Sequence, residues 1–285
     1  MNKKMIKKAL TLTLVLALGI TALTGCGGGS GAQTSGKVVI AGSTSVQPLS
    51  DELAKAFMDA NSGITVEVQG GGSGQAAISL ADGIADIGAL SREVNAEEKT
   101  TIVKEYVIAK DGVAVIVNPD VTVTDLSLEQ IKGIFTGEIK NWKEVGGKDQ
   151  VITIVSREEG SGTRGAFTEL TKVSVKDSAG TAVDSTSKNA IIQPSTGAAL
   201  QAVGSTPGAI GYVSMEAVND SVTALKVAGV TLSKETVLDG TYAISRPFIY
   251  AVTGKVSEAA QAYIDFVMSA KGQALVEENG FISVK

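Results

Sequence analysis

The sequence contains no histidine and a single cysteine, Cys26, among its 285 residues. Without histidine, the chain lacks the commonest general base of enzymes and the commonest metal-ligating side chain. With one cysteine, it can form no disulfide within the chain. We therefore predict that the protein is not an enzyme and that it has no catalytic residue, metal or cofactor.

The N-terminal apolar stretch, Ala9 to Leu23, is too short to be a permanent membrane span, because it has about 15 residues where a spanning helix needs roughly 20. Four lysines precede it, which is typical of a secretory signal peptide. The stretch ends in Leu23-Thr24-Gly25-Cys26, which resembles a bacterial lipobox. The resemblance implies cleavage before Cys26, whose sulfur then carries a diacylglycerol. The alternative is a membrane-span remnant with an incidental cysteine.

Residues 1–25 are thus predicted to be the signal peptide and residues 26–36 a lipidated tether. The tether is a run of Gly, Ser, Gln and Thr without apolar anchors, which is typical of a flexible linker. Two or more acyl chains, palmitate among them, hold a protein firmly on a membrane. We expect an extracytoplasmic lipoprotein on the outer face of the cell membrane.

An excess of basic charge is also missing. The chain has 25 basic and 30 acidic residues, and the predicted signal peptide holds four of the lysines and no acid. The mature formal net charge is therefore −9, which argues against nucleic acid as a partner. Overall charge cannot draw an anion to such a protein, so local groups would have to attract an anionic ligand.

From Lys37 onward, short β-branched runs alternate with helical stretches, and no internal repeat is evident. Val38–Ile40 and Thr65–Val68 have strand composition, and each is followed by a predicted helix, at Val46–Ala60 and near Gln75–Gly83. Strands and helices that alternate at this spacing predict an α/β fold.

Two further apolar runs, Val113–Val117 and Phe248–Val252, are short enough to be buried strands. We interpret them as crossings between two lobes. The first lobe is predicted to comprise residues 37–112 plus 246–285, and the second residues 113–245. The second lobe is expected to carry strands at Val151–Val155 and Ala209–Val213, and a helix that a capping box opens at Ser127.

Three glycine-rich corners, Gly42–Ser45, Gly70–Gly74 and Gly160–Thr163, each follow a predicted strand and open a predicted helix. The first N–H groups of a helix have no internal partners, and the helix dipole adds partial positive charge there. Such a corner can bind an anion, with glycine allowing close approach and hydroxyls adding donors. Each corner alone is more often a plain turn, but three can converge on one cleft.

Arg157 lies three residues before Gly160, at the end of a predicted strand. Its guanidinium is a permanently charged, forked donor that suits an oxyanion. The alternative is a surface arginine paired with Glu158 or Glu159.

Four motifs together resemble the phosphate-binding proteins of bacterial phosphate ABC importers. They are Gly42–Val46, Gln69–Gly74, Asp86–Glu93 and, above all, Arg157–Arg164. Supporting stretches are Ile131–Gly147 and Pro207–Val213. The resemblance runs from about Val39 to the C-terminus, and it implies a two-lobed, type II periplasmic-binding-protein-like α/β fold with a hinge of two crossing strands.

The resemblance also implies a set of phosphate-binding residues. From the motif positions they are Thr44, Ser45, Ser73, Ser91, Arg92, Arg157, Ser161, Gly162 and Thr163. For Arg92 two interpretations stay open, a ligand donor or a residue that locks Ser91 through Glu93 or another acid. Trp142 is interpreted as core packing, Asp86 as structural and Arg164 as a charge at the cleft rim.

Ser91 departs from the family pattern, because members of the enteric type have an aspartate at this position. A carboxylate there accepts the phosphate proton and repels fully ionised sulfate, which enforces the choice of phosphate. The Ser91 hydroxyl can still accept a hydrogen bond, and Glu159 is a candidate substitute acceptor.

The predicted function is capture of inorganic phosphate for an ABC permease in the cytoplasmic membrane, by a monomer that closes its two lobes over the anion. Sulfate, molybdate and related tetrahedral oxyanions are the alternative ligands. A serine hydrolase is disfavoured because Gly160-Ser161-Gly162 lacks the full elbow spacing and no histidine exists. A P-loop is disfavoured because no Gly-Lys-Ser/Thr follows Gly70–Gly74. An adhesin or signalling use of the fold is a further alternative.

Overall fold

The computed structural model describes residues 35–177 and 182–285. The predicted signal peptide, Cys26 and the tether up to residue 34 lie outside the described residues. The first strand, β1, begins at Gly36, which the sequence analysis had placed in the tether. β1 therefore starts one residue before the predicted first lobe, because Gly36 already pairs in register with Ile64.

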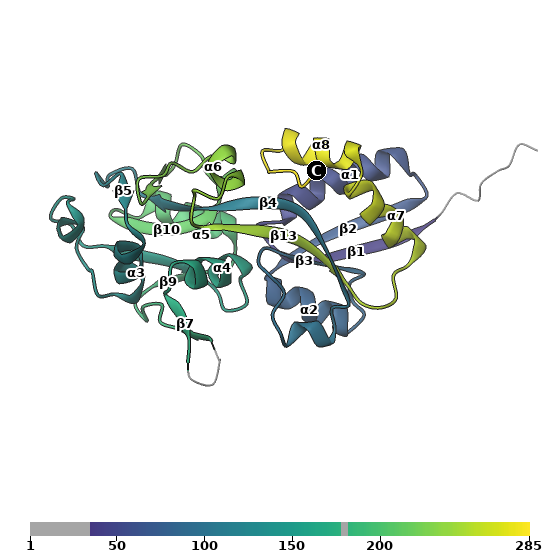
Figure 1. Cartoon of the computed structure of the whole chain (residues 1–285), viewed down its shortest axis with the longest axis horizontal. Coiled ribbons are helices and arrows are strands. Elements are labelled where there is room, and N and C mark those ends of the chain that lie inside the picture. The colour runs from purple at the N-terminus through teal and green to yellow at the C-terminus, as the bar shows by residue number, and fades with distance from the viewer. Residues whose placement is uncertain (1–34, 178–181) are drawn as a thin grey trace, which may run out of the picture. The chain divides into compact units, whose positions relative to one another are not determined.

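The described residues are built around a nine-stranded mixed sheet (Figure 1) with the order β2-β1-β3-β13-β4-β10-β6-β9, and β11 alongside β4. Its strands are β1 (Gly36–Ser43), β2 (Ile64–Gly71), β3 (Ile87–Leu90), β4 (Lys104–Val117), β6 (Thr153–Arg157), β9 (Ile191–Gln193), β10 (Ala209–Ser214), β11 (Thr223–Ala224) and β13 (Ser245–Val252). Two small sheets pair β5 (Asp125–Leu126) with β12 (Lys226–Val227) and β7 (Ser174–Lys176) with β8 (Ala182–Asp184).

The helices follow the strands in the alternation that the sequence predicted. They are α1 (Gln47–Ala60), α2 (Ser73–Ala81), α3 (Leu128–Thr136), α4 (Gly162–Leu170), α5 (Thr196–Ser205), α6 (Lys234–Leu238), α7 (Glu258–Val267) and α8 (Ala270–Glu278). Single 3₁₀ turns occupy Glu98–Thr100, Trp142–Val145 and Met215–Ala217. β1 pairs in parallel with both β2 and β3, as strands joined by crossover helices do. The predicted α/β fold is confirmed.

One local prediction is confirmed and another differs in detail from the structure. The capping box at Ser127 is present, with Gln130 reciprocating, and it starts α3. α2 begins at Ser73, two residues earlier than expected. Gly72 has the extended backbone conformation of an N-cap residue, so the helix starts at the next residue.

β4 and β13 run side by side (Figure 1). They connect two large hydrophobic clusters, a first one that contains Phe57 and Tyr263 and a second one that contains Phe167 and Tyr212. Residues 104–112 of β4 pair with β13, whereas residues 113–117 pair with β10. In the predicted crossing run Val113–Val117, alternate residues pack in the second cluster and the two between them in a further one, so the crossing falls just before this run. The other predicted crossing run, Phe248–Val252, contributes to the first cluster, so on β13 too the crossing lies before the run. We propose that the two lobes divide here, close to the boundaries expected from the sequence.

The two clusters have different aromatic centres. In the first, Phe57 packs edge-on against Tyr263, with ring centroids 5.3 Å apart. In the second, Phe167 stacks on Tyr212 at 4.0 Å. Trp142 is buried in the second cluster, and its indole N–H donates to the Gly208 carbonyl. The prediction that Trp142 packs in the core is therefore confirmed.

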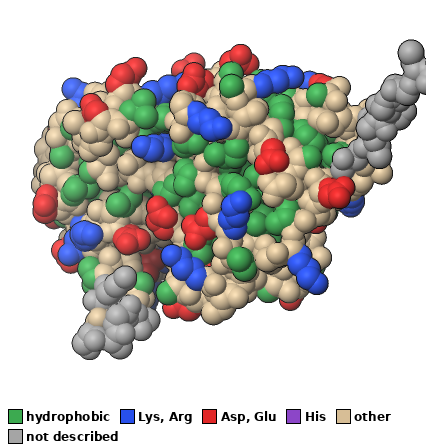
Figure 2. Space-filling model, turned by 45° about the vertical axis from the view of Figure 1, so that its right-hand side comes forward, with side chains coloured by type: hydrophobic (Ala, Val, Ile, Leu, Met, Phe, Trp, Pro, Cys, Tyr) green, Lys and Arg blue, Asp and Glu red, His purple; other side chains and the backbone are tan. Residues whose placement is uncertain are grey.

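On the face drawn in Figure 2, acidic and basic side chains are interspersed and neither sign gathers into a patch. This agrees with the expectation that any attraction for an anion is local. Among the residues that the structure describes, no helix has the length and apolar character needed to cross a bilayer.

Candidate functional site

The three predicted corners all connect a strand to a helix: β1 to α1, β2 to α2 and β6 to α4. Gly72 is the N-cap of α2, and Ser161 caps α4 by accepting a hydrogen bond from the Arg164 amide. Gly42 lets the first corner lie close to β3, because a Cβ there would lie 2.2 Å from the Ala89 carbonyl oxygen. The corners lie at carboxyl ends of strands, where ligands bind in open α/β sheets.

Hydroxyl groups from distant parts of the chain meet between these corners. Ser45 Oγ lies 2.8 Å from Thr163 Oγ1 and 2.9 Å from Thr196 Oγ1. All three residues are buried, and they come from the β1–α1 corner, α4 and α5. The structure thus brings together Ser45 and Thr163, which the sequence had selected, with Thr196, which it had not.

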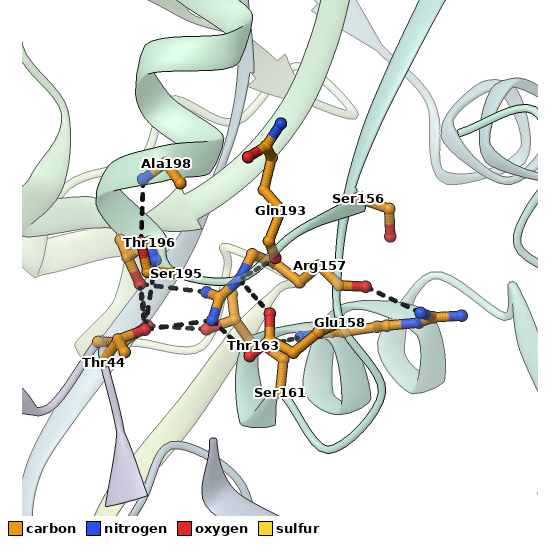
Figure 3. A network of polar contacts seen from close by, with 12 residues as sticks. Thr44, Ser156, Arg157, Glu158, Ser161, Thr163, Gln193, Ser195, Thr196 and Ala198 are labelled. Carbon is orange, nitrogen blue, oxygen red and sulfur yellow. Dashed lines mark hydrogen bonds and ion pairs between the residues drawn. The ribbon is translucent and has the colours of Figure 1, made fainter. Parts of the chain in front are cut away.

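Thr196 begins α5 directly after the N-cap Ser195, whose side chain accepts from the Ala198 amide. A fourth helix N-terminus therefore reaches the cluster (Figure 3). The signal in the sequence was Ser195-Thr196-Gly197 after a short apolar pair, which has the same chemistry as the other corners.

Arg157 is the last residue of β6, and its side chain is 2% exposed. Its Nη2 donates to Thr44 Oγ1 at 3.1 Å and its Nη1 to Thr196 Oγ1 at 3.2 Å, as Figure 3 shows. The guanidinium also pairs with Glu158, with Nε 2.8 Å from Oε2. The alternative of a surface arginine is wrong in one respect: the expected acidic partner is present, but the side chain is buried and faces the hydroxyls.

The backbone that carries Arg157 is held by Tyr212. The Tyr212 hydroxyl lies 2.7 Å from Ser156 Oγ and accepts a hydrogen bond from the Arg157 amide at 3.2 Å. Burial raises the pKa of Tyr212 to about 12, so its hydroxyl stays protonated in any ordinary buffer. This neutral contact fixes the end of β6.

Ser73 and Ser91 are fully buried beside these groups. The Ser91 amide donates to Ser73 Oγ at 3.0 Å, and Ser43 Oγ donates to Ser91 Oγ at 2.7 Å. A Cβ on Gly162 would lie 2.0 Å from Ser73 Oγ and 2.5 Å from Ser91 Oγ. Gly162 therefore permits a contact between the second and third corners that any side chain would prevent. Ser43 is a further member that sequence reasoning missed.

The second and third corners also touch through backbone, because the Gly74 amide donates to the Gly160 carbonyl at 3.0 Å. A groove of about 430 Å³ opens beside this contact. Its lining residues are Gly71, Gly72, Gly74, Gln75, Ile78, Glu158, Glu159, Gly160 and Pro194. Gly72 and Gly74, the chain neighbours of Ser73, line this groove, and so does Gly160 of the third corner.

Arg92 has its guanidinium bound by the Glu98 carboxylate through two contacts of 2.7 Å. It also donates to the Glu93 carbonyl. These contacts fit the interpretation in which Arg92 locks the Ser91 segment through an acid, and the acid is Glu98. A direct contact between Arg92 and an anion stays a prediction.

The remaining charged candidates lie outside the hydroxyl cluster. Arg164 pairs with Asp184 at 2.8 Å and donates to the Arg157 carbonyl, so it supports the third corner from behind. Asp86 accepts from the Val39 amide at 2.9 Å, which fits a structural role. Glu159 is exposed at the groove.

Comparison of the chain with known proteins identifies its family. The PBP superfamily domain matches residues 28–271 of the chain. The phosphate-binding protein PstS of Bacillus subtilis is 36% identical over 258 residues, which cover 88% of this chain and 82% of that protein. The chain belongs to the phosphate-binding protein family of the PBP superfamily.

Solved structures support the same assignment. A candidate phosphate ABC transporter substrate-binding protein from Clostridium perfringens, with bound phosphate, is 39% identical with a TM-score of 0.81 and covers 88% of this chain and 100% of its own. An ABC-type phosphate transport receptor from Vibrio cholerae is 33% identical with a TM-score of 0.72 and covers 86% and 99%. The periplasmic-binding-protein-like fold expected from the motifs is therefore confirmed.

Proposed function

We propose that this protein is an extracytoplasmic solute-binding protein that captures inorganic phosphate and delivers it to an ABC permease in the cytoplasmic membrane. One observation carries the proposal above the others. The buried Arg157 guanidinium reaches hydroxyls of both the β1–α1 corner and α5, in a family whose relatives are phosphate-binding proteins. We further propose that it acts as a monomer, without catalysis or cofactor, and that a lipid on Cys26 anchors it.

The arrangement suits a small tetrahedral anion. Desolvating such an ion is expensive, so several donors must meet its oxygens at once. The site supplies the guanidinium and hydroxyls of the β1–α1 corner, α4 and α5. Helices α1, α2, α4 and α5 begin at these corners, where N-terminal amides favour anions. We propose that Thr44, Ser45, Ser73, Ser91, Arg157, Ser161, Gly162 and Thr163 bind the anion, together with Thr196, and that Arg92 acts indirectly.

Substitution of Arg157 tests this proposal. Loss of one charged donor from a buried anion site costs about 2 to 5 kcal/mol, so Arg157→Met should weaken phosphate binding at least about tenfold in calorimetric titration. Arg157→Lys is the matched control, because it keeps the charge and loses the fork, and its affinity should fall between the other two. A folded Arg157→Met variant with unchanged phosphate affinity would contradict the proposal.

Sulfate or molybdate is the second candidate ligand. The contacts of Ser91 favour this alternative, because within the described part of the chain they include no group that would repel a fully ionised anion. In the described residues, Ser91 contacts Ser43, Ser73 and Arg246 and no carboxylate. At Ser91, therefore, a protonated phosphate oxygen finds hydroxyl acceptors, and a fully ionised anion meets no carboxylate that is bonded to this residue in the described structure. Titration with phosphate, sulfate and molybdate in parallel distinguishes the ligands.

A further inference from the structure

Arg246 is a second buried arginine close to the candidate site. It lies on β13 where this strand crosses between the clusters, and its side chain is 1% exposed. Its Nε donates to Asp111 Oδ2 at 2.9 Å, and Nη2 lies 2.8 Å from the same oxygen. Asp111 is its cross-strand partner on β4, so the ion pair spans the two crossing strands.

Asp111 and Arg246 also form hydrogen bonds outside the pair, and these reach different elements. Asp111 Oδ1 accepts from Ser214 Oγ at 2.7 Å and from the Met215 amide at 3.3 Å, at the end of β10. Arg246 Nη1 donates to the Ser91 carbonyl at 3.2 Å, just beyond β3. The pair therefore connects the crossing strands to Ser91, the residue that follows β3.

Stability alone explains the pair poorly. Burying two charges costs several kcal/mol per ion, and apolar residues of similar size often replace such pairs without loss. Burial raises the pKa of Asp111, an effect that the guanidinium of Arg246 opposes. Arg246 also lies near enough to Arg157 for the two cations to repel each other. A second buried cation near an anion site suggests a role in binding.

Ser91 is the residue through which Arg246 reaches the site. Its amide is held by Ser73, its hydroxyl by Ser43 and its carbonyl by Arg246. The first two partners belong to the anion corners themselves. Of the hydrogen bonds that Ser91 makes within the described residues, the one from Arg246 comes from a side chain of a crossing strand, and the forked head of Arg246 contacts Asp111 and Ser91 at the same time.

We propose that Arg246 is a positioning residue for oxyanion binding: anchored on Asp111, it holds the Ser91 carbonyl and thereby fixes the Ser91 hydroxyl in the anion site. This inference rests on the proposed function. A lysine at this position can pair with Asp111 but cannot also hold Ser91, because it has one compact ammonium group in place of a fork.

A double-mutant cycle with phosphate calorimetry tests the proposal. Arg246→Lys should melt close to the wild type and bind phosphate about tenfold more weakly. Ser91→Ala should lose a similar factor, and the double variant should bind within about twofold of Ser91→Ala alone. Wild-type affinity in folded Arg246→Lys or in Ser91→Ala, or losses that multiply to about a hundredfold, would overturn the proposal.

A second variant guards against failure of Arg246→Lys to fold. The D111N/R246Q pair removes both charges together and keeps groups able to hydrogen-bond, and it should show the same non-additivity with Ser91→Ala. If the wild-type protein binds no phosphate, the proposed function is wrong. If it binds phosphate but the losses of the single variants are additive, only the positioning role of Arg246 is wrong.

Discussion

Replacing Gly162 with alanine tests how closely the corners must approach. Gly162 is the first residue of α4, and the new methyl group would lie 2.0 Å from Ser73 Oγ and 2.5 Å from Ser91 Oγ. Both hydroxyls are fully buried and bonded, so neither can turn away freely. The methyl group must therefore displace them or keep the second and third corners apart.

The size of the effect follows from the contacts at risk. Two hydrogen bonds, from the Ser91 amide to Ser73 and from Ser43 to Ser91, are disturbed. Each contributes about 1 kcal/mol net. Loss of the same hydroxyls as ligand donors adds a similar amount, so phosphate binding should weaken by about 2 to 4 kcal/mol, or roughly 30-fold to 1,000-fold. The same two hydrogen bonds also stabilise the ligand-free protein, so the unfolding free energy should fall by up to about 2 kcal/mol while both hydrophobic cores stay closed.

Gly197→Ala is the matched control, because Gly197 lies in the first turn of α5 and a Cβ there meets nothing within 4 Å. Calorimetric titration with phosphate and thermal melting without it should be run on both variants. Gly197→Ala should bind within about twofold of the wild type. Equal affinities for the two variants, or a wild-type affinity for Gly162→Ala, would refute the close approach described here.

Three further predictions follow from the same contacts. Ser91→Asp should lower sulfate affinity at least about tenfold relative to phosphate in competition titrations, because a carboxylate repels a fully ionised anion; an unchanged ratio would contradict this. Burial raises the pKa of Tyr212 and of Tyr250 to about 12, so each contributes stability that is complete below pH 10 and is lost as pH rises towards 12. By pH 11 each should have lost about 1 kcal/mol of unfolding free energy, measured by urea denaturation, and Tyr212→Phe should reduce the loss. Cys26→Ser should abolish incorporation of labelled palmitate in cells, and labelling that persists would exclude this anchor.

Much of the fold was readable from local patterns. The capping box at Ser127, the helix from residue 47 and the apolar strand at 209–214 follow from capping chemistry and from hydrophobic runs that any short window contains. Strand β6 was less readable. It was expected at Val151–Val155 but lies at Thr153–Arg157, because its end is set by pairing with β9, a strand of only three residues far along the chain.

The candidate site divides in the same way. Ser45, Thr163 and Arg157 were selected because each belongs to a recognisable corner, and the structure places them together. Ser43 was missed although it belongs to the first corner, because its bond to Ser91 cannot be read from that corner. Thr196 was missed because its segment, Ser195-Thr196-Gly197, lies outside the three corners that had been selected. Arg246 could not be selected at all, since its contact with Ser91 spans 155 residues and arises only from the crossing of β4 and β13.

A crystal structure of the protein grown with phosphate tests the central claim most directly. The site described here predicts a tetrahedral anion within hydrogen-bonding distance of the Arg157 guanidinium and of hydroxyls from Ser45, Ser91 and Thr163. Phosphate bound elsewhere, with Ser45 still bonded directly to Thr163 and Thr196 as it is here, would contradict it.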